Sequence, residues 1–392
     1  MSWSAEGKRI GEETRMKLRY GVIGGGNNGF IGGVHRRAAG FDDLAELVAG
    51  VFSRNETANL MTAAQWGADP SRTYTDFREM AEQESTREDG VDFVSVATPN
   101  FTHYEIAKTF LEHGIHVVCD KPLTLTVEEA EKLEQIAQER DLLLGVSYTY
   151  SGYPILIQAR EMLRSGQLGK IQLLKARYEE DYLADWEPGK MTDRTSWYKD
   201  PTKNGKTGCT AGIGTHAEYL LRFLSGLEPQ RLLARFSYTI PESLVETGVN
   251  ALLEYETGAE GIIWATNTAV GHHNDVAVEV LCERGTISWS QYDATRLIVS
   301  RLGGPEERYD AARPYLLPEA RTASRLPAGH PEGFYEAFAN VYRRFCMDLI
   351  TLKEGRELSV YHFPTVHDGL LGMRFVEACY QSHHAGNIWI SV

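Results

Sequence analysis

A glycine-rich turn near the start of the chain has the spacing of a dinucleotide-binding site. The segment Gly24-Gly25-Gly26-Asn27-Asn28-Gly29 fits the pattern G-x-G-x-x-G, between an apolar run typical of a strand and a segment typical of a helix. In that context the glycines allow a tight turn, a close approach of the backbone to a pyrophosphate, and close packing of helix on strand. The N–H groups at the helix start would bind the phosphates. The predicted cofactor contacts in this turn are Gly24, Gly26, Asn27, Asn28 and Gly29.

The residues after the second expected strand would bind the adenosine ribose and select between NAD and NADP. An acidic residue there would bind the ribose 2′-hydroxyl, but the chain has Phe52-Ser53-Arg54-Asn55 instead. Ser53 can hydrogen-bond a ribose hydroxyl or a 2′-phosphate. Arg54 can stack on adenine, pair with that phosphate, or lie solvated at the surface. We predict both residues as cofactor contacts and NAD as the cofactor, with NADP left open.

Two further polar motifs follow expected strands, at the edge of a parallel sheet where ligands bind. They read Ala97-Thr98-Pro99-Asn100-Phe101-Thr102-His103 and Cys119-Asp120-Lys121-Pro122. Beside a nicotinamide, the ammonium of Lys121 could hold a substrate hydroxyl and stabilise an alkoxide. The alternative is an ordinary lysine in a surface loop. The predicted cofactor contacts from these motifs are Thr98, Asn100, His103, Asp120 and Lys121.

A cationic segment with aromatic residues lies over 186–206, inside an otherwise acidic chain. Aromatic faces suit the apolar faces of a sugar ring, and cations suit a carboxylate, sulfonate or phosphate. The segment either forms a wall of the substrate pocket or is a solvated loop. Tyr150, which follows the last strand of the first domain, contacts either the sugar or the domain hinge. The predicted substrate contacts from these two places are Tyr150, Lys190, Arg194, Trp197 and Lys199.

The elements that must position these residues change in character along the chain. Short apolar runs alternate with helical patterns up to residue 147, which predicts a parallel sheet covered by helices on both faces. Later segments alternate apolar and polar residues, which predicts an antiparallel sheet with one open face. The expected strands are 18–24, 44–52, 91–97, 115–119, 142–147, 170–181, 228–240, 249–267 and 276–291. The expected helices are 28–39, 55–67, 102–113, 126–140, 154–166, 333–353 and 364–382, with 301–332 expected to be a loop.

Length and composition limit the function classes. With 392 residues and 42% hydrophobic content, the chain is expected to form about two globular domains. The net charge of −14 disfavours nucleic acid and membrane surfaces as partners. The five cysteines are scattered, which indicates neither a metal site nor a disulfide framework and suits a cytoplasmic location. Residues 1–16 have the composition of a polar tail.

Taken together, these motifs resemble those of the Gfo/Idh/MocA family of sugar and cyclitol oxidoreductases. The resemblance covers residues 17–392 and includes Gly214-Thr215-His216 as well as the motifs above. Gly152-Tyr153-Pro154 and His330-Pro331-Glu332-Gly333 are typical of a longer-chain branch of the family.

The resemblance implies an α/β Rossmann domain over 17–150. It also implies an α+β substrate and oligomerisation domain over 151–392, with an open-faced, mainly antiparallel sheet and with last helices that pack back toward the Rossmann domain. Lys121 would be the active-site lysine. His216 would be the second catalytic residue, acting as acid or base on the reacting hydroxyl, with Thr215 beside the substrate. A homodimer or homotetramer is implied as well.

The chain departs from the family pattern at two positions. Glu-Lys-Pro is replaced by Asp120-Lys121-Pro122, and the aspartate expected four residues before the histidine is Gly212. Either His216 acts alone, or a neighbour replaces the missing carboxylate. The candidates for that replacement are Glu218, Tyr219 and Tyr178.

Three functions fit these residues. The first is an NAD(P)-dependent dehydrogenase of a ring hydroxyl, at C3 in our first expectation, in a sugar, glycoside or cyclitol. The second is an NAD-dependent glycosidase that cleaves an anionic glycoside, such as a sulfoquinovoside, by oxidation, elimination, hydration and reduction without net NADH. Related enzymes that work this way lack the usual aspartate. The third is a non-catalytic cofactor-binding sensor, which the presence of Lys121 and His216 argues against.

Overall fold

The computed structural model describes residues 16–26, 29–185, 200–241, 243–360 and 362–392. Contacts divide the chain into two compact units. The first unit comprises residues 1–124, 128–149 and 334–370, and the second comprises 125–127, 150–333 and 371–392.

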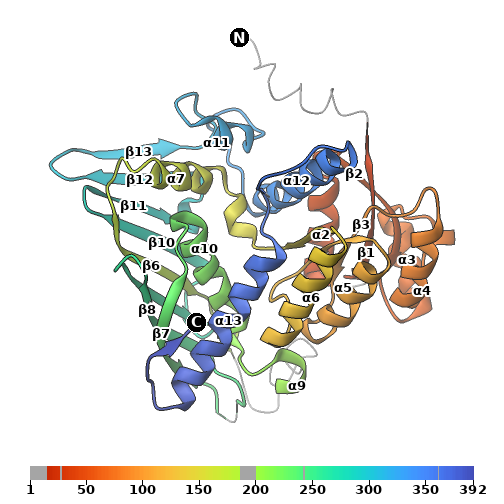
Figure 1. Cartoon of the computed structure of the whole chain (residues 1–392), viewed down its shortest axis with the longest axis horizontal. Coiled ribbons are helices and arrows are strands. Elements are labelled where there is room, and N and C mark those ends of the chain that lie inside the picture. The colour runs from red at the N-terminus through yellow and green to blue at the C-terminus, as the bar shows by residue number, and fades with distance from the viewer. Residues whose placement is uncertain (1–15, 27–28, 186–199, 242, 361) are drawn as a thin grey trace. The chain divides into compact units, whose positions relative to one another are not determined.

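A five-stranded parallel sheet forms the centre of the first unit (Figure 1). Its strands are apolar along most of their length because side chains on both sides of the sheet are buried. All five residues of the central strand β3 are buried, for example. The sheet order is β2-β1-β3-β4-β5, which confirms the predicted doubly covered α/β pattern. The strands are β1 (Leu18–Gly24), β2 (Ala45–Val51), β3 (Phe93–Ala97), β4 (His116–Cys119) and β5 (Leu144–Val146).

Helices follow the strands of this sheet. Four of them match predicted segments: α2 (Phe30–Gly40), α3 (Glu56–Trp66), α5 (His103–Glu112) and α6 (Val127–Glu139). The later helix α12 (Phe334–Lys353) belongs to the same unit and packs on α2. The aromatic rings of Phe338 and Tyr342 on α12 meet the imidazole of His35 on α2.

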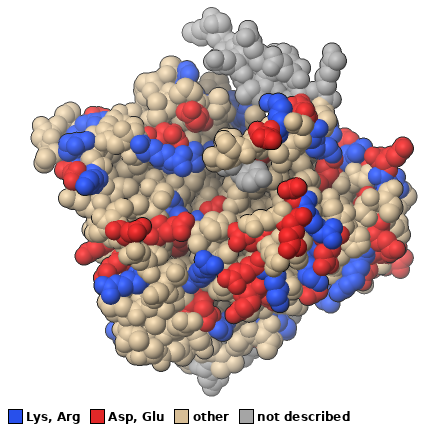
Figure 2. Space-filling model, in the orientation of Figure 1, with Lys and Arg blue, Asp and Glu red and all other residues tan. Residues whose placement is uncertain are grey.

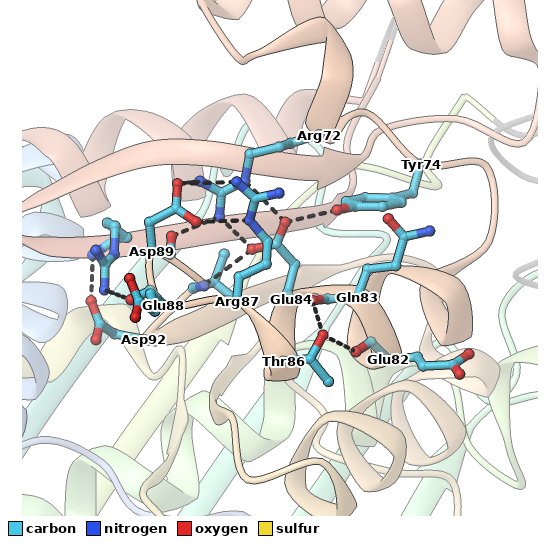
Figure 3. A network of polar contacts seen from close by, with 12 residues as sticks. Arg72, Tyr74, Glu82, Gln83, Glu84, Thr86, Arg87, Glu88, Asp89 and Asp92 are labelled. Carbon is cyan, nitrogen blue, oxygen red and sulfur yellow. Dashed lines mark hydrogen bonds and ion pairs between the residues drawn. The ribbon is translucent and has the colours of Figure 1, made fainter.

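One helix of the first unit, α4 (Phe77–Thr86), was not predicted from the sequence. Most of its residues are polar, and the apolar spacing is too sparse to signal a helix. A buried polar network fixes it in place (Figure 3). Glu84 accepts hydrogen bonds from the Arg72 guanidinium at 3.0 Å and from the Tyr74 hydroxyl at 2.8 Å. Tyr74 in turn donates its backbone N–H to the carbonyl of Gly50 in β2, so the network supports the end of that strand.

The second unit is built on a nine-stranded sheet with the order β13-β12-β11-β10-β6-β9-β8-β7-β14. β6 and β9 are parallel and the other neighbours are antiparallel, which confirms the predicted mainly antiparallel sheet. The first five strands in chain order are β6 (Ile171–Glu179), β7 (Pro229–Ser237), β8 (Gly248–Tyr255), β9 (Glu260–Thr266) and β10 (Asp275–Cys282). The remaining strands are β11 (Gly285–Ser290), β12 (Arg296–Arg301), β13 (Glu306–Asp310) and β14 (Ile390–Ser391).

Two helices pack against this sheet on one face. They are α7 (Pro154–Arg164) and α10 (Thr215–Ser225), and they also contact each other (Figure 1). On the opposite face, apolar side chains at the centre are left accessible: Leu252 is 46% exposed, Ile262 40% and Trp264 47%. Charged residues on that face pair across strands, Lys175 with Glu279 at 3.1 Å and Arg231 with Glu254 at 2.6 Å.

The prediction of a loop over 301–332 was wrong in part. This segment contains β13 and a short helix, α11 (Pro318–Thr322). β13 reads Glu-Glu-Arg-Tyr-Asp and lacks an apolar alternation, so its sequence resembles a loop. Ion pairs to β12 compensate, because Arg296 contacts Asp310 at 3.2 Å and Arg301 contacts Glu307 at 2.6 Å.

Other segments also differ from the expectation. The segments 249–267 and 276–291 each form two strands rather than one, and α10, β12 and β14 were not predicted. The last long helix, α13 (Val366–His384), follows its predicted range closely. Within the described part of the chain, none of the helices has the length and apolar character needed to cross a membrane.

Candidate active site

The glycine turn after β1 has a backbone that other residues would not adopt. Gly24 and Gly25 have φ angles of +93° and +77°, in the region that favours glycine. Gly26 donates its N–H to the carbonyl of Phe52 at 3.0 Å, and a Cβ on Gly26 would lie 2.4 Å from that oxygen. This side-chain-free surface at a helix N-terminus fits the pyrophosphate of a dinucleotide. Asn27 and Asn28, also predicted to contact the cofactor, lie outside the described residues.

The close contact between turn and helix involves a glycine that the sequence analysis did not single out. A Cβ on Gly32 would lie 2.2 Å from the Cα of Gly25, whereas Gly29 begins the helix as its N-cap residue. A Cβ on Gly29 would also lie 3.0 Å from the Cα of Gly25, so both glycines allow the close packing and Gly32 makes the tighter contact. Its signal in the sequence was a glycine pair inside an expected helix, which is unfavourable unless packing requires it.

The end of β2 presents Ser53 and Arg54. Arg54 is exposed, and the Ser53 hydroxyl accepts the N–H of Asn55 at 3.1 Å, so its own O–H can point to a ligand. A residue that sequence reasoning missed, Asn59, fixes this end of the strand. Its side-chain oxygen accepts the N–H of Phe52 at 2.8 Å, and its amide donates to the carbonyl of Tyr74 at 2.6 Å.

The end of β3 is held by His103, which is fully buried. Its two ring nitrogens lie 2.9 Å from the carbonyl oxygens of Pro122 and Thr98. Burial lowers the pKa of His103, while the charge of Asp120 and the two carbonyl oxygens act in the opposite direction. His103 therefore connects the two polar motifs at the ends of β3 and β4. Asn100, predicted as a further cofactor contact, is half-buried in the turn between them.

Lys121 follows β4, and its neighbour Asp120 anchors it. Asp120 Oδ1 accepts the N–H of Lys121 at 2.9 Å and the hydroxyl of Ser147 at 2.5 Å. His35 Nε2 lies 3.7 Å from the same oxygen. Burial alone would raise the pKa of Asp120, but the nearby His35 and the charge of Lys121 hold it below its ordinary value. Asp120 is therefore ionised next to the lysine.

A buried row of polar groups extends behind Asp120. His35 Nδ1 lies 2.6 Å from the hydroxyl of Tyr342, which lies 2.7 Å from the hydroxyl of Ser95. The row joins α2, α12 and β3 to the residue before Lys121. Neither His35 nor Tyr342 could be identified from the sequence, because each lies on an ordinary amphipathic helix far along the chain from Lys121.

His216 lies in the second unit, in the first turn of α10, directly after a π-helical turn over Thr210–Gly214. Such turns are frequent at functional sites. The imidazole is buried beside two tyrosine rings, with centroid distances of 4.9 Å to Tyr150 and 6.0 Å to Tyr178. Thr215 is also buried, and its hydroxyl donates to the carbonyl of Ala211 at 2.9 Å.

The two tyrosines beside His216 are linked through their hydroxyls. Those of Tyr150 and Tyr178 are 2.8 Å apart, and Tyr178 donates to the side-chain oxygen of Asn274 at 2.9 Å. Burial raises the pKa of both tyrosines, so both are neutral donors. Asn274 has a φ of +53°. It supports this pair from a loop that the sequence analysis did not consider.

The three candidates for replacing the missing carboxylate at Gly212 lie in different surroundings. Glu218 is bound by Arg222, with 3.0 Å between Oε1 and Nε. Tyr219 packs against the ring of Phe223. Tyr178 lies beside His216. The surroundings of the imidazole described here are therefore aromatic.

The cationic segment predicted to contact substrate lies mostly outside the described residues. This applies to Lys190, Arg194, Trp197 and Lys199. Two lysines at its end are described, and both form ion pairs within the chain. Lys203 lies 3.4 Å from Asp200, and Lys206 lies 2.9 Å from Glu377.

A separate ionic cluster lies at the end of β6 and β10 in the second unit. His272 Nδ1 is 2.9 Å from Asp275 and 3.7 Å from Glu179, and these three residues could hold a metal ion. However, Arg177 contacts Asp275 at 3.1 Å and Glu179 at 3.3 Å. The guanidinium therefore already supplies the positive charge that the two buried carboxylates require.

Comparisons with known proteins agree with this geometry. Residues 18–148 match the GFO/IDH/MocA model described as an oxidoreductase family with an NAD-binding Rossmann fold, and residues 156–288 match the GFO/IDH/MocA C-terminal domain. An uncharacterised oxidoreductase of Bacillus subtilis (strain 168), YfiI, is 30% identical over 95% of this chain and 96% of the relative.

Two crystal structures of an inositol dehydrogenase homologue from Azotobacter vinelandii are also similar. The complex with NAD+ has a TM-score of 0.92 and 35% identity, and covers 97% of this chain and 98% of that one. The complex with NADH and myo-inositol has a TM-score of 0.90 and 34% identity, and covers 96% and 98%. The chain thus belongs to the GFO/IDH/MocA family of NAD-binding oxidoreductases.

Proposed function

We propose that this protein is an NAD-dependent dehydrogenase that oxidises a ring hydroxyl of a sugar or cyclitol. The observation that carries the proposal is the arrangement at the edge of the parallel sheet. There a pyrophosphate-sized glycine turn and a lysine anchored by an ionised carboxylate both follow strands of one sheet. A bound nicotinamide would supply the hydride acceptor. The inositol dehydrogenase homologue and its myo-inositol complex support the substrate class.

Lys121 would orient the reacting hydroxyl. Its ammonium donates hydrogen bonds but accepts none, so it would bind the hydroxyl oxygen and stabilise the negative charge that develops when the proton leaves. The backbone bond from Lys121 to Asp120 fixes where the side chain starts.

His216 would take the proton from that hydroxyl. An imidazole has an ordinary pKa near neutrality, which suits proton transfer. The rings of Tyr150 and Tyr178 pack beside the imidazole.

The substrate would be an uncharged polyol in the first instance. Lys203 and Lys206, near the end of the 186–206 segment, form ion pairs with Asp200 and Glu377. These two lysines are therefore less available to bind an anionic substrate. Ring contacts to Tyr150 suit the C–H face of a pyranose or cyclitol.

The test incubates the protein with NAD and a panel of cyclitols, neutral glycosides and sulfonated or uronic glycosides. NADH absorbance and release of the aglycone are followed together. We expect NADH to accumulate with a cyclitol or sugar, and a substrate deuterated at C3 tests whether that carbon loses the hydride. Aglycone release without NADH would instead support the glycosidase. Neither signal with any compound in the panel would count against both reactions. The variant Lys121→Met should keep the cofactor contacts of the glycine turn and lose the activity.

We also propose that the protein forms homo-oligomers through the open face of the nine-stranded sheet. Its centre is apolar, and the same face has the ion pairs of Lys175 with Glu279 and Arg231 with Glu254. A covering surface therefore needs no excess charge of either sign, and a second copy of the same face satisfies this requirement.

The sequence favours a cytoplasmic location, and we propose it here as well. All five cysteines are free and buried, which suits a reducing compartment.

A further inference from the structure

We propose that Glu246 positions His216. Its partners are three consecutive backbone N–H groups at the start of the helix that carries the imidazole. Gly208 donates to Glu246 Oε2 at 2.8 Å, and Thr210 donates to Oε1 at 2.7 Å. Between them, Cys209 donates to the main-chain carbonyl of Glu246 at 3.3 Å. This inference rests on the proposed role of His216 and adds a residue to it.

The bonds matter because a helix start leaves N–H groups without partners inside the helix. Cys209 already has helical backbone angles, and the chain continues through the π turn into α10 without a break. No residue next to the turn caps it with a side-chain hydrogen bond. The side chain of Glu246, from a distant segment, therefore accepts these N–H groups.

Glu246 is itself held rigidly. The next residue, Thr247, donates its N–H to the carbonyl of Ser237 at 2.8 Å and accepts the N–H of Asn267 at 2.9 Å. These contacts fix Glu246 at the entrance to β8 and connect the helix to the sheet. Because His216 lies eight residues after Gly208, about two helical turns, a shift at this cap moves the imidazole relative to Tyr150 and Tyr178.

The cap matters for His216 because the chain has a glycine at position 212, where the family pattern has an aspartate. Gly212 has no side chain that could hold the imidazole from within the helix. The start of the helix, which Glu246 caps, therefore contributes to the position of His216. Glu246 is fully buried, and the titratable groups near it are the thiols of Cys209 and Cys379 and the phenol of Tyr238.

The experiment compares Glu246→Gln with Glu84→Gln. The first variant has one acceptor oxygen for two N–H donors, and its amide faces the other donor. The second removes a carboxylate of similar burial that also accepts a backbone N–H, from Val91, in the first unit. Thermal denaturation shows how much each variant loses in stability, so a general loss can be separated from an effect on His216.

The decisive measurement is the NMR titration of the His216 ring in the protein without substrate, because it does not depend on any activity. We expect Glu246→Gln to change the pKa of His216, since the loss of a cap bond moves the imidazole relative to the rings of Tyr150 and Tyr178. Glu84→Gln should leave this titration unchanged. If Glu246→Gln does not fold, Glu246→Asp keeps two acceptor oxygens with a shorter reach, and the His216 titration should then also differ from that of wild type.

Activity provides the second measurement. We expect Glu246→Gln to lower kcat at least about tenfold, since small displacements of a catalytic group cost this much or more, with KM for NAD unchanged. An unchanged His216 titration in a folded Glu246 variant would overturn the inference. If wild type itself shows no activity on the panel, the proposed function fails, but the NMR titration still tests the role of Glu246.

Discussion

At the scale of single residues, ordinary polar groups in unusual surroundings create the site. Lys121 is placed through the backbone by Asp120, and Asp120 stays ionised because His35 and Lys121 lie near it. His216 has two tyrosine rings beside it, and their hydroxyls bond to each other. The residues that act on substrate in our proposal therefore depend on neighbours with no catalytic role of their own.

The hydroxyl of Tyr178 offers a direct test of that dependence. Tyr178→Phe keeps the ring beside His216 but breaks the link from Tyr150 to Asn274. We expect a loss of about 1 kcal/mol in stability and a fall of about tenfold in kcat. KM for NAD should stay the same. The control is Tyr20→Phe, which removes a buried hydroxyl bonded to the carbonyl of Arg36. It should lose similar stability and keep its kcat, whereas equal kinetics for the two variants would show that the Tyr178 hydroxyl has no positioning role.

At the scale of elements, the shape of the cofactor site depends on how closely α2 approaches the glycine turn after β1. Gly32 in α2 faces Gly25 in the turn, and Gly26 faces the carbonyl of Phe52 at the end of β2. Each contact leaves no room for a side chain. The strand, turn and helix therefore act as one unit, whose shape is set by the glycines.

Gly32→Ala tests this packing. The new Cβ would lie 2.2 Å from the Cα of Gly25, a backbone atom that cannot move without shifting the turn. We expect NADH affinity, measured by fluorescence titration, to fall at least about tenfold. Gly33→Ala is the matched control because nothing lies within 4 Å of its Cβ. There we expect unchanged affinity and a gain of about 0.5–1 kcal/mol in stability. Normal affinity in Gly32→Ala would contradict the assigned contact.

The elements also show how far a sequence can predict this molecule. Long apolar runs predicted the five parallel strands, and alternation predicted most strands of the second sheet, because both patterns follow directly from burial. α4 and β13 were not predicted because they have few apolar residues, and ion pairs contribute to holding each of them. Four single residues were not predicted for a different reason, because each contacts a partner that is far along the chain or in another element. These residues are His35, Gly32, Asn274 and Glu246. Local spacing contains no information about such contacts.

At the scale of the whole molecule, the composition gives an acidic chain, and its charges are dispersed. Figure 2 shows Lys and Arg side chains interspersed with Asp and Glu over the face that it presents. The open face of the nine-stranded sheet combines such pairs with an apolar centre. The mixed signs leave no large single-sign patch on the face in Figure 2 for a strongly charged partner.

Trp264→Lys should therefore lower the mass of the particle in solution. A lysine at a position that is 47% exposed leaves the isolated chain folded but places a charge in the centre of the proposed contact. Light scattering after gel filtration should show the wild type as an oligomer and the variant as a smaller species. Val270→Lys is the control, since Val270 is 82% exposed in a loop outside the sheet strands. A wild-type mass equal to one chain would contradict the proposal.

Two buried groups predict how stability depends on pH. Burial lowers the pKa of His116 from 6.5 to about 4, and its ring accepts the N–H of Leu143. Its contribution to stability is present above pH 6.5 and is lost as pH falls toward 4. Burial raises the pKa of Glu246 from 4.5 to about 7. Its contribution is present below pH 4.5 and is lost as pH rises toward 7. Between pH 4.5 and 6.5 the two effects therefore oppose each other.

Single variants of Glu246 and His116 should separate the two effects of pH on stability. Between pH 4.5 and 6.5, the unfolding free energy of Glu246→Gln should rise with pH more steeply than that of wild type, by up to about 1.4 kcal/mol per pH unit for one proton. His116→Asn keeps an acceptor for Leu143 but cannot titrate, so its slope should change by a similar amount in the opposite direction. Urea denaturation at several pH values measures both slopes. Parallel curves for wild type and both variants would mean that neither group has its assigned pKa, and the burial that supports the cap on the His216 helix would then need another explanation.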